Sequence, residues 1–331
     1  AHRISVLVIG DVMLDAYLIG QVNRISPEAP VPIVDVHQRD KRLGGAANVA
    51  KNLIALGAQV QVAATVGDDA SGQEIQRLFQ TQGIGTAALV EVPGRPTTVK
   101  TRVISNGQQL LRVDEEQASE LEEPWTAELI ARCQDVIDNE RIDVVIFEDY
   151  DKGTLTPTVI ETVSVLCRER GIKTTVDPKF RNFDRYRHVD LFKPNLKEMR
   201  EGLSMAIHKE SDASLAQAVQ RMHERLEASI SLVTLSERGV CFYAPDHSQG
   251  FQRIPAFERE ITDVSGAGDA VIAVASVLLA LDVPVWQIAA VANLAGGLVC
   301  EKVGVVTVER ERLQAEWETN ADAMAALMNS K

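Results

Sequence analysis

Residues 263–269 read Asp-Val-Ser-Gly-Ala-Gly-Asp and lead directly into the apolar run 270–281. A glycine-containing turn before such a run predicts a loop that enters the N-terminus of a buried helix, where unpartnered amides favour an anion. Gly266 and Gly268 allow the backbone to approach a phosphate group, and Asp269 is placed to accept a proton from an attacking hydroxyl group. From these seven residues alone, a glycine-rich cap with a dipole-stabilising aspartate fits equally well.

The composition describes a globular, acidic protein. The chain has 331 residues, 45% of them apolar, and carries 47 Asp and Glu against 34 Lys and Arg. This balance argues against a broad nucleic-acid or anionic-membrane surface. The run 270–281 is shorter than the roughly 20 residues of a membrane-spanning helix, and the N-terminus does not resemble a signal peptide. The cysteines show no metal-ligand spacing: Cys133, Cys167, Cys241 and Cys300. We expect a cytoplasmic location with no membrane or nucleic-acid partner.

Strand-like runs alternate with helical patterns along most of the chain. The strand-like runs are 4–9, 60–66, 143–147, 173–176, 191–193 and 229–235. The helical patterns between them are 46–56, 72–82, 128–139, 157–170 and 214–227. This alternation predicts an α/β fold with a doubly wound, mostly parallel sheet that carries helices on both faces. Ligands of such sheets bind where the strands end, so the residues that follow each strand are candidate site residues.

Two segments, about 16–36 and 97–114, contain alternating strand-like stretches without helices between them. They predict a small accessory β-sheet within a single domain that covers residues 1–331. Such a sheet could close over a substrate as a lid, or pair with its copy in a second subunit, because it leaves an apolar face and edges to cover. Ordinary hairpin decoration is the alternative.

Gly44 and Gly45 precede the helical pattern 46–56, where Asn48 offers a donor and an acceptor to a polyol. Alone this pattern most often marks a turn. Followed by Gly266 to Asp269 in the same chain, however, it resembles the ribokinase-type (PfkB) sugar kinases. Residues 195–198 (Asn-Leu-Lys-Glu) are similar to the Asn-x-x-Glu element of that family, and residues 234–239 to its nucleotide-contacting turn. The resemblance covers essentially the whole chain and implies a ribokinase-like fold.

Further motifs are similar to the branch of this family that phosphorylates D-glycero-D-manno-heptose 7-phosphate at its anomeric hydroxyl. These motifs are 24–32, 108–114, 149–153 and 177–179. Ser265 stands where threonine is commoner in the family, and Asp151 stands where a small residue is usual. Many relatives continue into a nucleotidyltransferase domain, whereas this chain ends at Lys331, so the resemblance implies the stand-alone kinase.

The resemblance assigns roles to individual residues. It implies that Asp269 is the general base and that the amides of Gly266, Ala267 and Gly268 hold the transferring phosphoryl group. The residues expected to contact the sugar are Asp15, Gly44, Gly45, Asn48 and Asp149. The residues expected near ATP are Asn195, Glu198, Thr234, Ser236, Gly239 and Asn293, with Glu198 organising Mg²⁺ through water. Asn195 and Glu198 also read as a capping box, and both roles can coexist.

A sugar that already carries a phosphate needs cations at its far end. The family-like positions for them are Arg102, Arg112, Lys152 and Lys179, with Lys179 and Arg112 favoured. For each of these side chains, a solvated surface position is an equally good interpretation.

The resemblance implies ATP and Mg²⁺ as cofactors, leaves a monovalent cation open, and favours a homodimer formed through the lid. Gly10 has no G-x-G-x-x-G around it and the chain has no Walker A sequence, which points away from dinucleotide-dependent oxidoreductases and P-loop enzymes. Two alternatives stay open: a kinase for another sugar, sugar phosphate or nucleoside, and a non-catalytic sensor on the same fold. The presence of Asp269 directly after Gly266 and Gly268 favours a catalytic kinase over the sensor.

Overall fold

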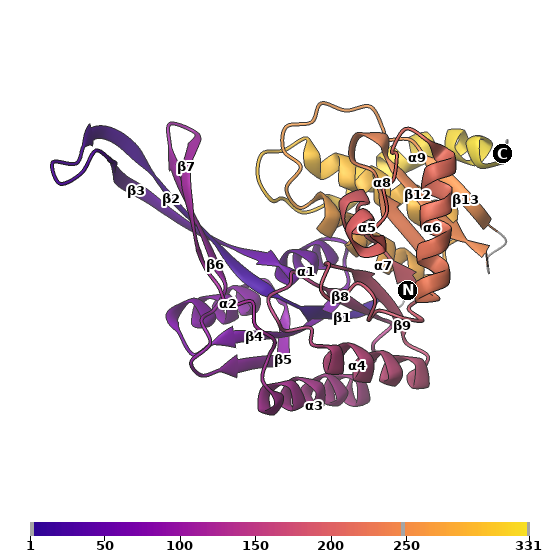
Figure 1. Ribbon diagram of the computed structural model, residues 1–331, viewed down its shortest axis with the longest axis horizontal. Coiled ribbons are helices and arrows are strands. Elements are labelled where there is room, and N and C mark those ends of the chain that lie inside the picture. The colour runs from indigo at the N-terminus through magenta and orange to yellow at the C-terminus, as the bar shows by residue number, and fades with distance from the viewer. Residues whose placement is uncertain (1–2, 246–248, 330–331) are drawn as a thin grey trace.

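A nine-stranded sheet forms the centre of the protein in the computed structural model, which describes residues 3–245 and 249–329 (Figure 1). Its strand order is β13-β12-β11-β10-β9-β8-β1-β4-β5. The strands are β1 (Ser5–Gly10), β4 (Gln59–Gly67), β5 (Gly85–Val92), β8 (Val144–Glu148), β9 (Lys173–Asp177), β10 (Leu191–Phe192), β11 (Ile230–Thr234), β12 (Val240–Ala244) and β13 (Gln249–Ile254). Pairing is parallel from β5 to β11, and β12 and β13 add an antiparallel edge. The predicted mostly parallel sheet is confirmed.

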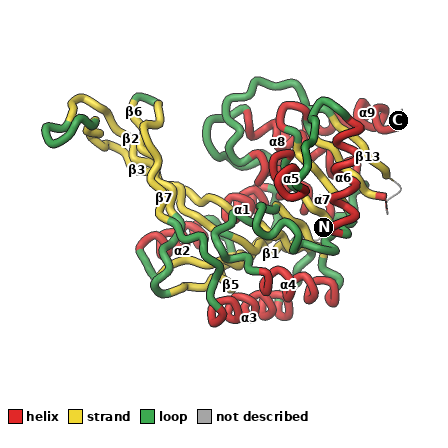
Figure 2. Tube along the Cα trace, viewed as in Figure 1, coloured by secondary structure: helices red, strands yellow, loops and turns green. Residues whose placement is uncertain are grey.

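Helices cover both faces of this sheet because side chains alternate along each buried strand. In β1, Val6 and Val8 belong to one apolar core, whereas Leu7 and Ile9 belong to the other. The first core is completed by α1 (Ala46–Ala55), α2 (Ala70–Thr81), α7 (Ala267–Ala280), α8 (Val285–Cys300) and α9 (Arg310–Asn329). The second is completed by α3 (Glu123–Asn139), α4 (Pro157–Arg170), α5 (Leu196–Leu203) and α6 (Asp212–Leu226). Figure 2 shows helices flanking the strands in the body of the molecule.

Local capping explains where several helices begin. Thr156 accepts a hydrogen bond from the amide of Val159, and Pro157 occupies the first turn of α4. In α3, Pro124 occupies the first turn, and the helix begins at Glu123. It therefore starts five residues before the predicted pattern at 128. The short helix α5 begins with the capping box expected at Asn195 and Glu198.

A second, four-stranded sheet projects from the body as an arm, which we call the lid (Figure 1). Its strands are β2 (Val12–Ile25), β3 (Pro32–Gly45), β6 (Val99–Ser105) and β7 (Gln108–Glu115), in the order β3-β2-β6-β7. The predicted small sheet is therefore present, but two of its strands are longer than the segments 16–36 and 97–114 suggest. β2 begins just after β1, and β3 runs into α1, so the lid is continuous with elements of the body.

All four cysteines are buried free thiols. Among residues 3–245 and 249–329, none of the helices combines the length and the apolar content that a bilayer crossing requires.

Candidate active site

The N-terminus of α7 presents free backbone amides, as the sequence predicts. Gly266, the N-cap residue, has φ 79°, which lies in the left-handed region that favours glycine. A Cβ atom there would also lie 3.1 Å from Nδ2 of Asn48. The amide of Ala267 donates weakly within the turn at 3.3 Å, whereas the amides of Gly266, Gly268 and Asp269 have no acceptor in the described part of the chain. Three donors at the positive end of the helix dipole can therefore bind an anion.

Asp269 is held from two sides. Asn48 Nδ2 donates to its Oδ2 at 2.5 Å, and the Tyr150 hydroxyl donates to its Oδ1 at 2.9 Å. The side chain is buried, and burial raises the pKa of Asp269, with a further increase from Asp177. The two hydrogen bonds lower this pKa but do not cancel the effect of burial. A carboxylate with a raised pKa in a fixed orientation is suited to general-base chemistry.

The sugar-contacting candidates Asp15, Gly44, Gly45 and Asn48 lie where the lid meets the body. Oδ1 of Asn48 is buried without a hydrogen-bond partner in the described chain, so it can accept a bond from a ligand hydroxyl. Arg102 Nη1 donates to Asp15 Oδ1 at 2.6 Å. Gly44 has no room for a side chain, because a Cβ atom would collide with the Asp15 carboxylate, and Gly45 has φ 62°. These glycines keep the floor of the site free of side chains.

Three buried carboxylates lie beside the amides of α7. One oxygen each from Glu148, Asp177 and Asp269 falls within 4.8 Å of the others. Oε2 of Glu148 is buried without a partner in the described residues, and Lys193 Nζ lies 2.7 Å from Asp177. Burial raises the pKa of Glu148 well above its usual value, and Asp177 and Asp269 raise it further. Carboxylate oxygens at this spacing fit a hard divalent cation such as Mg²⁺, which would offset their mutual repulsion.

Glu198, the residue expected to organise Mg²⁺, uses both oxygens within the protein. Oε1 pairs with Lys179, and Oε2 accepts the Asn195 amide at 2.8 Å. Burial lowers the pKa of Lys179, but Asp177 and Glu198 outweigh this effect and raise it, so the ammonium group stays charged. Lys179 also lies 5.3 Å from the ring centroid of Tyr150. A contact of Glu198 with metal-bound water remains a prediction.

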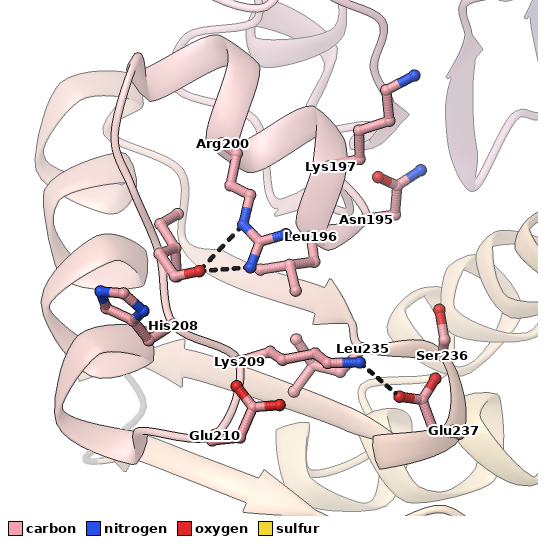
Figure 3. Close-up of a pocket in the computed structure, with 11 residues that line it drawn as sticks. Asn195, Leu196, Lys197, Arg200, His208, Lys209, Glu210, Leu235, Ser236 and Glu237 are labelled. Carbon is pink, nitrogen blue, oxygen red and sulfur yellow. Dashed lines mark hydrogen bonds and ion pairs between the residues drawn. The ribbon is translucent and has the colours of Figure 1, made fainter.

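Three of the residues expected near the nucleotide, Asn195, Thr234 and Ser236, lie at the end of β11. Thr234 and Asn195 form an isolated parallel bridge, so the two motifs that contain them are adjacent. Asn195 and Ser236 line a cavity of about 530 Å³, together with Leu235, Arg200 and other side chains (Figure 3). An ion pair of 2.9 Å between Lys209 and Glu237 also belongs to this cavity.

Two other nucleotide candidates have structural roles that were not predicted. Gly239 has φ 83°, and a Cβ atom there would collide with the backbone of Ile254, so only glycine fits. Asn293 Nδ2 donates to the carbonyl of Pro255 at 2.8 Å. The Asn293 side chain thus ties α8 to the segment that follows β13.

Asp149, expected to contact the sugar, instead has both oxygens engaged within the protein. Oδ1 accepts the Asp151 amide at 2.8 Å, and Oδ2 accepts Asn182 at 3.1 Å and the Tyr186 hydroxyl at 2.7 Å. Burial raises the pKa of Asp149 to about 6. These bonds fix the loop that carries Tyr150 to Asp269.

The four cations expected to bind the substrate phosphate are all paired with carboxylates. Lys152 lies 2.8 Å from Glu116, and Arg112 lies 2.8 Å from Asp114 with 49% of its side chain exposed. Arg102 and Lys179 pair with Asp15 and Glu198, as described above. The sequence pattern places these cations near the lid and the strand ends, but it does not reveal their local partners.

Comparison with known proteins gives the family. The sequence matches the model of the pfkB family carbohydrate kinases over residues 3–312. The chain belongs to this family. It is accordingly a phosphotransferase that acts on a sugar hydroxyl, as predicted.

Curated relatives and solved structures agree with this assignment. The chain is 40% identical over 308 residues to the bifunctional protein HldE of Geobacter metallireducens, covering 93% of the chain and 62% of that protein. It is 39% identical to HldE of Geotalea uraniireducens over all of the chain and 68% of that protein. The chain thus spans about two thirds of the length of these relatives.

Solved structures with low sequence identity share the fold of this kinase. Phosphofructokinase-2 from Escherichia coli in complex with potassium superposes with a TM-score of 0.77 at 18% identity, covering 96% of this chain and 99% of that one. Ribokinase from Thermotoga maritima gives a TM-score of 0.66 at 16% identity, covering 94% and 98% of the two chains. The predicted ribokinase-like fold is confirmed.

Sequence reasoning gave no role to four residues of this kinase site: Glu148, Tyr150, Asp177 and Lys193. Glu148 and Asp177 are the last residues of β8 and β9, and Lys193 follows β10 directly. The rule that ligands bind where parallel strands end could have identified these three. For Tyr150, which lies within the 149–153 motif, the sequence offers no comparable signal.

Proposed function

We propose that this kinase transfers the γ-phosphate of ATP to the anomeric hydroxyl of D-glycero-D-manno-heptose 7-phosphate. The product would be the 1,7-bisphosphate used in ADP-heptose and lipopolysaccharide synthesis. The observation that carries the proposal is Asp269, fixed by Asn48 and Tyr150 at the amide-bearing end of α7. The motifs 24–32, 108–114 and 149–153 and the likeness to proteins named HldE support the heptose substrate. A kinase for ribose, fructose, fructose phosphate or a nucleoside is the alternative.

The geometry supports a direct transfer of the phosphoryl group. Oδ1 or Oδ2 of Asp269 takes the proton of the sugar hydroxyl while that oxygen attacks the γ-phosphorus and ADP leaves. The amides of Gly266, Ala267 and Gly268, joined by that of Asp269, would then lie against the transferring phosphoryl group. A Cβ atom at Gly268 would lie 3.5 Å from Lys193 Nζ, so the ammonium group of Lys193 adds positive charge beside these amides.

The same site is suited to Mg²⁺. We expect Glu148 and Asp177 to hold the ion, with Glu198 reaching it through water. When bound, Mg²⁺ neutralises charge on the phosphates of ATP. The nucleotide itself would lie along Asn195, Thr234, Ser236 and Gly239, with Asn293 nearby. The four free thiols are consistent with a reaction in the reducing cytoplasm.

A second copy of this chain is the proposed partner of the lid. β7 is exposed along its whole length, and its apolar side chains Leu110, Leu111 and Val113 are 42%, 48% and 46% exposed. On the hairpin formed by β2 and β3, the side chain of Ile25 is 60% exposed. Apolar side chains along an open sheet favour burial against a partner, and a homodimer would supply the same sheet.

A substrate panel tests the proposed function. We expect ATP-dependent phosphorylation with the highest kcat/KM for heptose 7-phosphate among four acceptors: this sugar, ribose, fructose 6-phosphate and adenosine. Product identity is read by mass and by phosphorus NMR. A higher kcat/KM for one of the other three acceptors would reassign the substrate and leave the family intact, whereas no turnover of any sugar would favour the sensor.

A further inference from the structure

Lys51 is a half-buried cation that none of the steps above uses. It lies on α1 three positions after Asn48, so the two side chains lie on one side of the helix, toward the sugar-binding residues. Within the described residues Lys51 makes no hydrogen bond and no ion pair, although burying an ammonium group without a partner is costly. Burial lowers the pKa of Lys51, and the nearby guanidinium of Arg42 lowers it further; the carboxylates of Asp15 and Asp269 raise it without cancelling this decrease.

Arg42 brings a second cation to the same place. In the lid, Arg42 on β3 lies opposite Asp15 on β2 in the strand register. Its guanidinium group lies 4.9 Å from the ring centroid of Tyr17. Arg102 lies 5.4 Å from the same centroid, so both guanidinium groups flank this ring at the base of the lid. A Cβ atom at Gly304 would lie 3.6 Å from Arg42 Nη1, so Arg42 reaches the segment that follows α8.

Lys51 differs from the neighbouring cations because each of the others forms an ion pair with a carboxylate. Arg42 has Asp40 at 2.7 Å, and Arg102 has Asp15 at 2.6 Å. On the same lid face Lys100 has Glu116 at 3.5 Å. In the part of the chain that the structure describes, Lys51 is the cation of this group that forms no ion pair, although Asp15 and Asp269 lie near enough to act on it electrostatically. Two neighbouring cations, one of them without an ion pair, form a site that an anion would stabilise.

We propose that Lys51, with Arg42 beside it, binds the phosphate group that the sugar substrate carries. This inference rests on the proposed function, because it requires a phosphorylated sugar as the acceptor. The ligand is a phosphomonoester dianion, which Lys51 meets as a point charge and Arg42 as a planar donor. Asn48 and Asp15 would then contact the hydroxyl groups between this phosphate and Asp269.

Kinetics of Lys51→Gln test the proposal. We expect KM for heptose 7-phosphate to rise about 10- to 100-fold, with kcat and KM for ATP changed by less than about twofold. The unphosphorylated heptose should bind the wild type poorly and be almost indifferent to the substitution. Lys51→Arg should retain most of the affinity. Lys41→Gln is the matched control, because Lys41 precedes Arg42 in β3 and therefore points to the opposite face of the lid.

A binding measurement separates this inference from the proposed function. Inorganic phosphate is titrated by calorimetry into the protein saturated with Mg²⁺ and a non-hydrolysable ATP analogue, which covers the amides of α7. We expect Lys51→Gln to weaken phosphate binding by about tenfold or more relative to wild type and Lys41→Gln. Equal affinities would overturn the inference even if heptose 7-phosphate is the substrate. Weakened binding in a chain that does not phosphorylate this sugar would sustain the phosphate site and refute only the proposed substrate.

Discussion

The carboxylate of Asp269 depends on side chains that are distant in sequence. Asn48 lies 221 positions before it and Tyr150 lies 119 positions before it, yet each donates to a different oxygen. Both bonds stabilise the charged form, while burial opposes it. The Tyr150 hydroxyl therefore does two things: it orients the carboxylate of Asp269, the proposed base, and it limits the increase in the pKa of this carboxylate.

Tyr150→Phe tests this role by pH dependence. Loss of the hydroxyl removes a bond to the charged carboxylate, so the pKa of Asp269 should rise further. Because the base must be deprotonated, activity is lost below its pKa, and the acidic limb of the kcat/KM profile should move to higher pH. Tyr243→Phe, in β12, is the control. An acidic limb that stays in place or moves to lower pH would remove Tyr150 from this role.

At the residue scale, the sequence predicts the groups that belong to local motifs. Asp269 and Asn48 each follow a pair of glycines in motifs that indicate phosphate and sugar binding. The structure brings the two side chains into contact. The strand-end rule makes Glu148 and Lys193 candidates, but it does not predict that they lie close together, because their proximity depends on the order β10-β9-β8 within the sheet. Periodicity predicts strands but does not give their neighbours.

Among the elements, the lid links directly to the site. β2 carries Asp15 and β3 ends at Gly45, the N-cap residue of α1, which carries Asn48. A change in the position of these strands would therefore act, without an intervening flexible linker, on the residues that we propose to contact the sugar. The predicted sheet is present, but alternation alone did not reveal that β2 and β3 each extend to 14 residues.

Hydrogen exchange tests closure of the lid. Heptose 7-phosphate contacts the base of the lid in our account, so its binding should protect amides of β2, β6 and β7 more than ATP alone does. Exchange is followed by mass spectrometry in the free protein and with each ligand at saturation. The strands β12 and β13, far from the sugar, are the internal control. Equal exchange in the lid with and without the sugar would reduce the lid to a fixed hairpin arm.

Short elements are only partly predictable from the sequence. The strand predicted at 191–193 is present as β10 (Leu191–Phe192), but its place between β9 and β11 is not contained in the local pattern. α5 has eight residues and is defined by its capping box more than by its periodicity. Short elements of this kind depend on tertiary contacts, which a local pattern does not contain.

For the whole molecule, two cores on the faces of one sheet explain why the alternation of strands and helices predicted the architecture so well. The arm outside these cores is different, because its exposed apolar side chains lack a partner in the described chain. The proposed homodimer supplies one.

Leu111→Asp tests the dimer. A charge in the exposed apolar stretch of β7 should prevent burial of this sheet face, so light scattering should give a dimer mass for wild type and a monomer mass for the variant. Leu281→Asp is the control, since Leu281 is 52% exposed at the end of α7, on the body of the protein. A wild-type monomer, or a Leu111→Asp dimer, would contradict assembly through the lid.

We propose that this kinase phosphorylates its sugar with Asp269 as the general base. Steady-state kinetics of Asp269→Asn with ATP and heptose 7-phosphate test it most directly, with Asp282→Asn, beyond the other end of α7, as the control. The amide keeps the shape but cannot accept the proton, so we predict a loss of about 10²- to 10⁴-fold in kcat with both KM values nearly unchanged. A variant that retained more than about a tenth of the wild-type kcat would contradict the account.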